Sequence, residues 1–228
     1  AIVLPRFYNR REEMTPSVFI GIPSTGIWQA EFGMALAGLM TTLTRPLKGG
    51  AVMEHVRLWN TKGSILPRSR TTLVQNALKS GCSHILFLDS DMVFPASTLH
   101  RLLQWDKAVV ACNCPVKTIP SNPTARFAPT VEHPAGVPVY TLPDSVGLQK
   151  VWRVGTGVML IKLSVFERIA QPWFPVEWNE VLDDYTGEDW AFCAALERAG
   201  IPIHIDAGLS REIGHVGDFR YEHIHVEV

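Results

Sequence analysis

The amino-acid sequence predicts an α/β fold, with a mainly parallel sheet, helices on both faces and a small, loop-rich antiparallel part. The prediction rests on three observations. Short apolar runs alternate with helix-patterned segments through the first half of the chain. These runs are almost continuously apolar, which is typical of parallel strands buried on both faces. Residues 115–150, in contrast, are rich in proline and poor in helix formers.

The first half is predicted to alternate between strands and helices. Pro67 begins one helix and Gly81 ends it, and the strand that follows stops abruptly at Asp89. Because each helix connects two strands, the strands are expected to run parallel. The predicted strands are residues 18–23, 52–59, 83–88 and 108–112, and the predicted helices are residues 28–43, 67–79 and 95–105.

The second half has a less regular pattern. We expect residues 115–150 to form a loop-rich excursion with a hairpin, including an extended piece at 137–142, over one edge of the sheet. Regular structure is predicted to resume at 151–162. A short helix at 164–169, a helix at 188–199 that stops at Gly200, and a strand at 203–206 are predicted to follow. The remaining tail is expected to be irregular.

Composition indicates one domain over residues 1–228 and excludes several classes of protein. Lys and Arg (21) nearly balance Asp and Glu (22), so there is no global positive field to hold a nucleic acid. No apolar run reaches the roughly 18–20 residues of a membrane-spanning helix. The charges near residue 1 follow their apolar patch, which is the wrong order for a secretory signal. Cys82, Cys112, Cys114 and Cys193 lack the spacing of a zinc site, so we expect buried free thiols in a cytoplasmic protein.

The strongest local signal is Asp89-Ser90-Asp91, which directly follows the strand predicted at 83–88. Open α/β sheets bind ligands at the carboxyl ends of their strands. Two carboxylates placed there repel each other unless a cation or hydrogen-bond donors neutralise them. A hard divalent cation such as Mn²⁺ or Mg²⁺ does so and also attracts phosphate oxygens. An ordinary aspartate turn is the alternative, and the apolar run before it favours a functional site.

His215 is a candidate further ligand for such a cation. It lies in the segment Gly214-His215-Val216-Gly217, whose glycines permit an unusual backbone. Imidazole is a common metal ligand, and a hydrogen-bonded structural histidine is the alternative. We expect the other late histidines to be structural: His204, His223 and His225.

Glu188 and Asp189 begin the predicted helix 188–199. Asp189 shares a helix face with Phe192, Cys193 and Leu196, so its carboxylate is expected to point inward. An inward-facing carboxylate suits a general base. An acidic pair that simply complements the helix dipole is the alternative.

Arg68 and Arg70 begin the predicted helix 67–79. Arg70 shares a face with Leu73 and Val74, so it is expected to point inward. It does so at the helix end where the dipole disfavours a cation. We therefore expect Arg70 to bind an anion, either Asp89 or a diphosphate.

Two glycine motifs fail as nucleotide-binding fingerprints. Gly155-Thr156-Gly157 lacks the third glycine of a dinucleotide motif, because position 160 is leucine. Residues 21–26 have the glycine spacing of a phosphate-binding loop, but Ile27 and Trp28 stand where Lys and Ser or Thr belong.

Taken in order, these pieces resemble the GT-A class of nucleotide-sugar glycosyltransferases, and family-2-like enzymes in particular. The resemblance spans residues 17 to 217. Its most specific part is ILFLDSDMVFP followed about 100 residues later by GEDWAFC. It also includes the IGIPS strand end, the R-x-R-x-x-x-V helix, the GTGVMLIK strand and the late His215.

The resemblance implies a donor site in residues 17–114 and an acceptor-binding, catalytic half in residues 115–228. Asp89 would contact the ribose or a metal-bound water, Asp91 would coordinate Mn²⁺ or Mg²⁺ at the diphosphate, and His215 would be the C-terminal metal ligand. A UDP-sugar is the favoured donor and a GDP-sugar the alternative. The donor pocket would include Pro23, Ser24, Thr25, Arg68, Arg70, Asp89 and Ser90.

For the acceptor side, the resemblance implies that Asp189 deprotonates a hydroxyl group and that Glu188 orients it or holds the acceptor. Gly155, Thr156 and Gly157 would form the floor beneath donor sugar and acceptor. The expected reaction moves one sugar to a glycan or another hydroxyl-bearing acceptor. In a retaining enzyme Asp189 need not be a base, and the sequence leaves the stereochemistry open.

Other functions fit parts of the sequence. LFLDSDMV also matches the opening motif of haloacid-dehalogenase-type phosphohydrolases, with Asp89 as nucleophile and Asp91 as acid and base. Two strands and two helices precede the motif here, and the later acidic motif of that family is missing. A non-catalytic glycan- or nucleotide-binding module is a further alternative. A modified DNA base is a minor candidate acceptor, for which the only basic arm is Arg6, Arg10 and Arg11.

Overall fold

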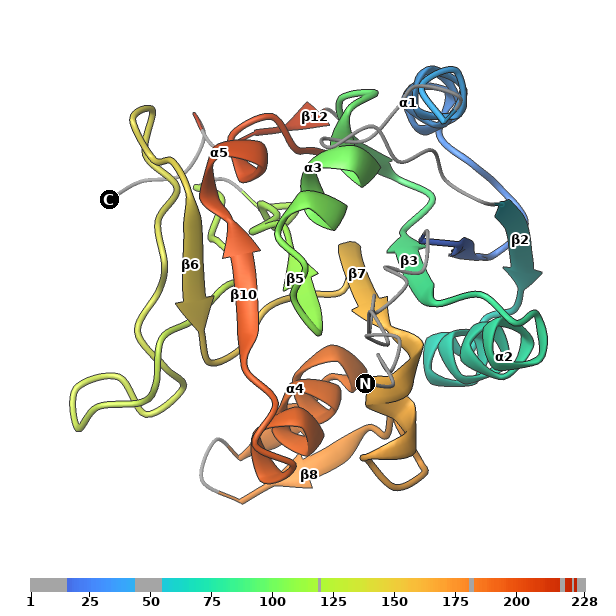
Figure 1. The fold of residues 1–228 in the computed structure, drawn as a ribbon. Coiled ribbons are helices and arrows are strands. Elements are labelled where there is room, and N and C mark those ends of the chain that lie inside the picture. The colour runs from blue at the N-terminus through green and yellow to red at the C-terminus, as the bar shows by residue number, and fades with distance from the viewer. Residues whose placement is uncertain are drawn as a thin grey trace, which may run out of the picture.

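A computed structural model describes residues 16–43, 55–118, 120–180, 183–217, 220–222 and 224. Its centre is a seven-stranded sheet with the strand order β2-β1-β3-β7-β5-β10-β6 (Figure 1). The strands are β1 (Val18–Ser24), β2 (Val56–Lys62), β3 (His84–Leu88), β5 (Val109–Ala111), β6 (Leu148–Val151), β7 (Val158–Lys162) and β10 (Ile203–Asp206).

The sheet is mostly parallel, which confirms the predicted fold class. β1 pairs in parallel with both β2 and β3, and β10 pairs in parallel with β5. β7 lies between β3 and β5 and runs antiparallel to both. β6 runs antiparallel to β10 at one edge of the sheet. Five strands therefore share one direction, so their carboxyl ends lie along the same edge of the sheet.

Helices cover both faces of the sheet (Figure 1). One face packs against α1 (Ala30–Met40), α3 (Thr98–Gln104) and the short α5 (Ala207–Ser210). The other face packs against α2 (Leu66–Lys79), the 3₁₀ helix η1 (Leu163–Glu167) and α4 (Glu188–Arg198). Among the described residues, none of these helices combines the length and the apolar character needed to pass through a membrane.

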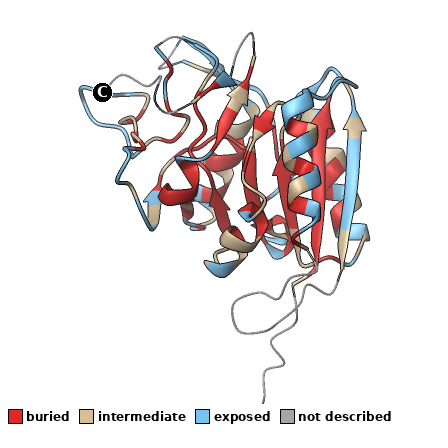
Figure 2. Cartoon of the chain, turned by 90° about the horizontal axis from the view of Figure 1, so that it is seen from above, coloured by how far each residue is buried: buried red, intermediate tan, exposed pale blue. Residues whose placement is uncertain are grey.

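The alternation of side chains along each strand divides the core in two. Ile85 and Phe87 of β3 pack with α2 and α4, whereas Leu86 and Leu88 pack with α1 and α3. Burial of each such side chain stabilises the fold by about 1.5–3 kcal/mol. Figure 2 shows the inner strands buried and the edge strand β2 largely exposed. The strongly apolar runs of the sequence are therefore the strands covered on both faces.

The first half agrees with the prediction apart from the ends of its elements and a short strand, β4 (Met92–Val93), that was not predicted. Residues 52–54 of the predicted second strand lie outside the described residues, and β2 begins at Val56. The helix predicted at 95–105 is confined to α3. The segment predicted as one regular element at 151–162 is divided, because β6 ends at Val151 and β7 begins at Val158.

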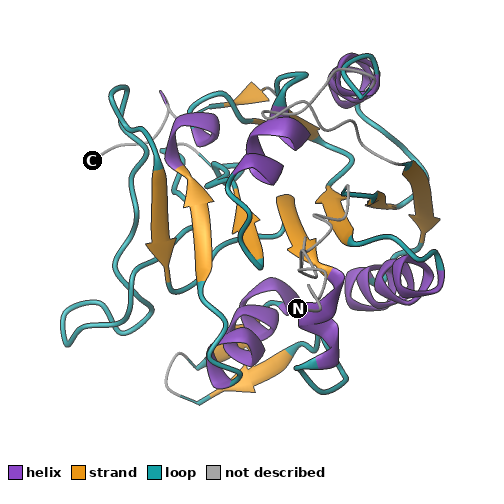
Figure 3. Cartoon of the chain, viewed as in Figure 1, coloured by secondary structure: helices purple, strands orange, loops and turns teal. Residues whose placement is uncertain are grey.

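The loop-rich segment largely agrees with the prediction, whereas the tail does not. Figure 3 shows a long loop between β5 and β6, as predicted. Its expected hairpin is reduced to backbone pairing around Arg126 and Pro138, and proline cannot donate the hydrogen bond that would extend the ladder. The prediction of an irregular tail is wrong, because β11 (Gly214–Val216) lies between β4 (Met92–Val93) and β12 (Arg220–Tyr221) in a small antiparallel sheet.

Candidate active site

The Asp89-Ser90-Asp91 turn lies at the carboxyl end of β3, as predicted. Its backbone is held from two sides. The Asp89 amide donates to the Gly157 carbonyl at 2.9 Å, which continues the pairing of β3 with β7. The Asp91 carbonyl accepts the Val216 amide at 2.8 Å, which attaches the turn to β11. The late glycine-flanked segment is thus brought to the aspartate turn by backbone hydrogen bonds.

Asp91 and His215 face each other across this small sheet. His215 is opposite Met92 in the β4–β11 register, and its Nε2 lies 3.4 Å from Asp91 Oδ2. Lys117 Nζ lies 2.5 Å from the same oxygen. Burial alone would raise the pKa of Asp91, but hydrogen bonds and charges from His215 and Lys117 outweigh burial and lower this pKa to about 2. Asp91 is therefore a permanently ionised carboxylate near neutral pH.

The orientation of the His215 ring leaves one nitrogen for a ligand. Nδ1 lies 2.9 Å from the Pro115 carbonyl oxygen, which can only accept a hydrogen bond, so Nδ1 carries a proton. Nε2 faces Asp91, to which its N–H donates, and a cation that binds here would take the place of that proton. A metal-binding histidine typically donates its other ring N–H to a backbone carbonyl in this way.

A cavity of about 430 Å³ opens beside these groups. Ser24 enters it from the end of β1 and is held there by the side-chain amide of Asn60, which donates to Ser24 Oγ at 2.8 Å. Gly26, with φ of 107°, continues the loop where a Cβ would lie 2.7 Å from the Lys62 side chain. The cavity is lined by Pro23, Ser24, Thr25, Ile27, Gln29, Gly63, Ser64, Leu66, Asp89, Ser90, Asp91 and His215.

Arg70 joins the aspartate turn to the start of α4. Its side chain is only 2% exposed. Nη2 donates to Asp89 Oδ2 at 3.1 Å, and Nε donates to Glu188 Oε1 at 3.3 Å. Nη1 lies 3.0 Å from Asp89 Oδ1 as an ion pair without hydrogen-bond alignment. Burial alone would lower the pKa of Arg70, but the charges of Asp89 and Glu188 outweigh it and raise this pKa.

Asp189 lies in the first turn of α4, next to this ion-pair network. It is half-buried, and its Oδ1 accepts the Trp190 backbone N–H at 2.7 Å. Burial raises the pKa of Asp189 to about 6; the charge of Glu188 acts in the same direction and that of Arg70 opposes it. A carboxyl with this pKa can take up a proton near neutral pH and release it again.

Several residues predicted from the sequence lie near the cavity but do not line it. Gly157 is beside Asp89, since a Cβ at position 157 would lie 3.6 Å from Asp89 Oδ2. Gly155 and Thr156 are buried, and the Thr156 hydroxyl has no hydrogen-bond partner among the described residues. Arg70 lies behind Asp89, and Arg68 is exposed on α2. Arg6, Arg10, Arg11, His223 and His225 lie outside the described residues.

The protein atoms that could ligate a metal at the cavity fit a hard divalent cation that takes its remaining ligands from water or substrate. Within the described part of the chain, no three His, Cys, Asp or Glu side chains are grouped closely enough to hold a metal ion by themselves. Asp91 and His215 supply one carboxylate and one imidazole nitrogen at the cavity wall. Mg²⁺ commonly takes only one or two protein carboxylates and completes its shell with water and substrate phosphates.

Sequence reasoning missed Lys117 and five residues that line the cavity: Ile27, Gln29, Gly63, Ser64 and Leu66. Ser64 follows β2 at the same sheet edge where Ser24 ends β1, so the strand-end rule applied to Asp89 could also have found it. The Gln29 backbone N–H donates to the Ser90 carbonyl at 3.1 Å, a contact with no signal in the sequence. Lys117 lies in the loop-rich segment and reaches Asp91 across 26 residues of chain.

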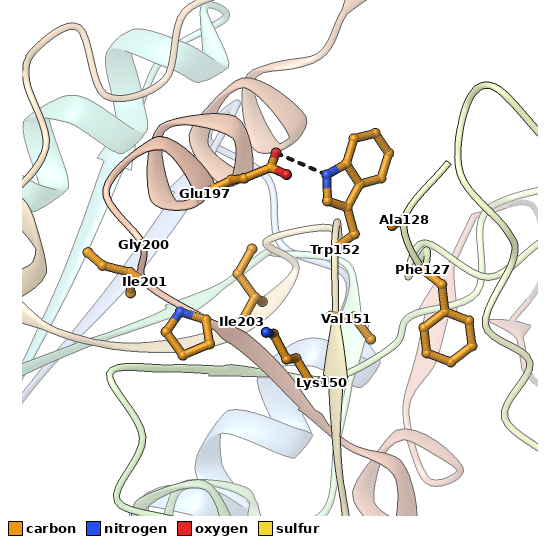
Figure 4. A pocket seen from close by; sticks show the side chains of 10 residues that line it. Phe127, Ala128, Lys150, Val151, Trp152, Glu197, Gly200, Ile201 and Ile203 are labelled. Atoms are coloured by element: carbon orange, nitrogen blue, oxygen red, sulfur yellow. Dashed lines mark hydrogen bonds between the residues drawn. The ribbon is translucent and has the colours of Figure 1, made fainter. Parts of the chain in front are cut away.

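A second cavity, of about 580 Å³, lies between β6, β10 and the end of α4 (Figure 4). Its wall includes Phe127, Lys150 and Ile203, and the Trp152 indole donates to the Glu197 carboxylate at 3.0 Å. None of the site residues predicted from the sequence lines it. We place the candidate site in the smaller cavity, because that one holds the facing carboxylate and imidazole groups.

The four cysteines are buried free thiols, as predicted. Burial raises the pKa of the Cys193 thiol to about 12 and that of the Cys112 thiol well above its usual range. The Cys112 and Cys193 thiols are therefore protonated and belong to the core.

No family model matches the chain, and no curated protein matches it. Among solved structures, the chain is similar to the crystal structure of A197 from STIV, with a TM-score of 0.54. The likeness covers 90% of this chain and 87% of that chain at 17% sequence identity. At this identity the likeness concerns the fold alone, and the fold agrees with the α/β architecture predicted from the sequence.

Proposed function

We propose that the chain is a GT-A-type glycosyltransferase that moves one sugar from a nucleotide-diphosphate sugar to a hydroxyl group, with Mn²⁺ or Mg²⁺ as cofactor. One observation carries the proposal: a single cavity gathers Ser24 from β1, the Asp89–Asp91 turn from β3 and His215 from β11. Its volume of about 430 Å³ is within the range of roughly 300–1,000 Å³ that small-molecule sites occupy.

The donor would lie along the carboxyl ends of β1, β2 and β3. Hydroxyl groups of Ser24 and Ser64 would bind the nucleoside, for which a UDP-sugar is the favoured candidate. Asp91 and His215 would hold the cation, which supplies positive charge to the diphosphate when bound. Asp89, fixed by Arg70, would accept a hydrogen bond from the ribose or from a water molecule.

Asp189 would act on the acceptor. It would remove the proton of the acceptor hydroxyl while that oxygen forms a bond to the anomeric carbon of the donor sugar. The bond from the anomeric carbon to the diphosphate breaks in the same step, and the nucleoside diphosphate leaves with the electron pair. The raised pKa of Asp189 and its place beside Glu188 support this role. The acceptor would be a glycan or another hydroxyl-bearing molecule.

The contacts of Asp89 weigh against the phosphohydrolase alternative. A nucleophilic aspartate needs a carboxylate oxygen free to attack phosphorus. Arg70 lies 3.1 Å from one Asp89 oxygen and 3.0 Å from the other. This pairing suits a carboxylate that positions its neighbours better than one that attacks a substrate.

A thermal-shift screen tests the proposal. UDP-, GDP-, CMP- and dTDP-sugars are added with Mn²⁺, with Mg²⁺ and with EDTA; a ligand at 100 times its Kd adds about 2.7 kcal/mol to stability. We expect one nucleotide-sugar to raise the melting temperature in a way that EDTA and Asp91→Ala abolish. Absence of any shift, together with phosphate release from simple phosphate esters, would favour the phosphohydrolase.

A further inference from the structure

Lys117 occupies the carboxylate oxygen that a cation would take. Its Nζ lies 2.5 Å from Asp91 Oδ2, and His215 Nε2 faces the same oxygen at 3.4 Å. An ammonium and a divalent ion on one oxygen repel each other strongly in a partly buried site. The Lys117 ammonium and a divalent ion would therefore compete for Asp91 Oδ2.

The backbone that carries Lys117 is fixed to the site. The Pro115 carbonyl accepts the His215 Nδ1–H at 2.9 Å, and the Val116 amide donates to the Asn122 carbonyl at 2.9 Å. Motion of the Lys117 ammonium is therefore motion of its side chain about an anchored backbone.

The Lys117 side chain passes over Gly217 on its way to Asp91. A Cβ at position 217 would lie 3.1 Å from Lys117 Cδ, so the methylene groups pass over the glycine at close range. The Lys117 side chain is still 36% exposed. The ammonium is thus guided to Asp91 yet has open solvent to move into.

We propose that the Lys117 ammonium is the cation that pairs with Asp91 when no metal ion is bound, and that a divalent ion must displace this ammonium to bind there. Lys117 then lowers the affinity of the site for the free ion. The freed ammonium remains tethered beside the position proposed for the anionic diphosphate. This inference rests on the cation role assigned under Proposed function.

Titration of the full chain with Mn²⁺, read from the electron paramagnetic resonance signal of unbound Mn²⁺, tests the inference without any sugar donor. Lys117→Met keeps the methylene chain and removes the charge, and Lys117→Gln is a second such variant. Lys117→Arg retains the charge. Lys162→Met is the matched control, because Lys162 also pairs with an aspartate, Asp106, away from the cavity. Circular dichroism checks that each variant is folded.

We expect Lys117→Met and Lys117→Gln to bind Mn²⁺ roughly tenfold more tightly than the wild type. Lys117→Arg and Lys162→Met should bind as the wild type does. Unchanged or weaker binding in both neutral variants, with binding lost in Asp91→Asn, would overturn the Lys117 inference and leave the cation site standing. Absence of Mn²⁺ binding in every protein would overturn the proposed cation role and this inference with it.

Discussion

The buried Arg70 side chain forms an ion pair with the half-buried Asp89, with Nη2 donating to Oδ2 at 3.1 Å. The pair joins α2 to the end of β3. The same guanidinium donates to Glu188, so it also fixes the first turn of α4. The Asp89–Asp91 turn and the helix start that carries Asp189 thus share one cationic anchor.

Arg70→Met should destabilise the fold by about 2–4 kcal/mol, because it leaves Asp89 and Glu188 without their counter-ion. The expected loss is below that of a fully buried pair, since these side chains are 26% and 15% exposed. Urea denaturation measures the change, and Arg68→Met on the exposed face of α2 is the matched control. A loss within about 0.5 kcal/mol of that control would show that Arg70 does not anchor the site.

Asp189→Asn should slow sugar transfer by roughly 10²–10⁴-fold and leave donor binding nearly unchanged, because the amide cannot take up a proton. Single-turnover kinetics measure the rate, and thermal shift with the donor measures binding. Asp184→Asn, at an exposed acid upstream of the same helix, should behave as the wild type. Near-normal transfer by Asp189→Asn would assign proton removal to another group or indicate a retaining reaction.

The pH dependence of transfer should report the Asp189 carboxyl. A base must be deprotonated, so kcat/KM should be level about one pH unit above the pKa of about 6, be halved at that pKa and approach a tenfold fall per unit well below it. Burial, the main cause of this raised pKa, is absent in the unfolded chain. If Asp189→Asn retains the same acidic limb, the limb belongs to a different residue.

His84 should make the fold less stable as the pH falls. Burial and the charge of Lys162 lower the pKa of His84 to about 4, whereas Asp106 acts to raise it. Between about pH 6.5 and 4 the unfolded chain binds a proton that the folded chain does not, so stability falls with decreasing pH over that window. His84→Gln should reduce the loss between pH 7 and 5 by about 1–2 kcal/mol. Equal losses in His84→Gln and in a control at exposed His133 would contradict this.

Local patterns were sufficient to predict the elements that depend on neighbours in sequence. The helical period placed Arg70 on the inner face of α2, and the abrupt end of an apolar run placed Asp89 at a strand end. The first inference succeeds because the 3.6-residue period is a property of the helical backbone. The second succeeds because a strand covered on both faces is apolar throughout its length.

Features that depend on pairing between segments far apart in the chain could not be predicted from local sequence patterns. Nothing in β7 indicates that it lies between β3 and β5, since strand order depends on contacts far apart in the chain. β11 and β12 have three and two residues, too few to show a period. Lys117 reaches Asp91 from a loop whose path no local rule predicts.

The most direct test of the proposed function is release of nucleoside diphosphate from a panel of nucleotide-sugars, measured by chromatography with Mn²⁺ and with or without glycan acceptors. We predict that the wild type releases the diphosphate from one donor, that EDTA or Asp91→Asn abolishes the release, and that Glu197→Gln, in the other cavity, preserves it. The account would be contradicted if no donor were cleaved while the wild type hydrolysed simple phosphate esters and Asp89→Asn did not.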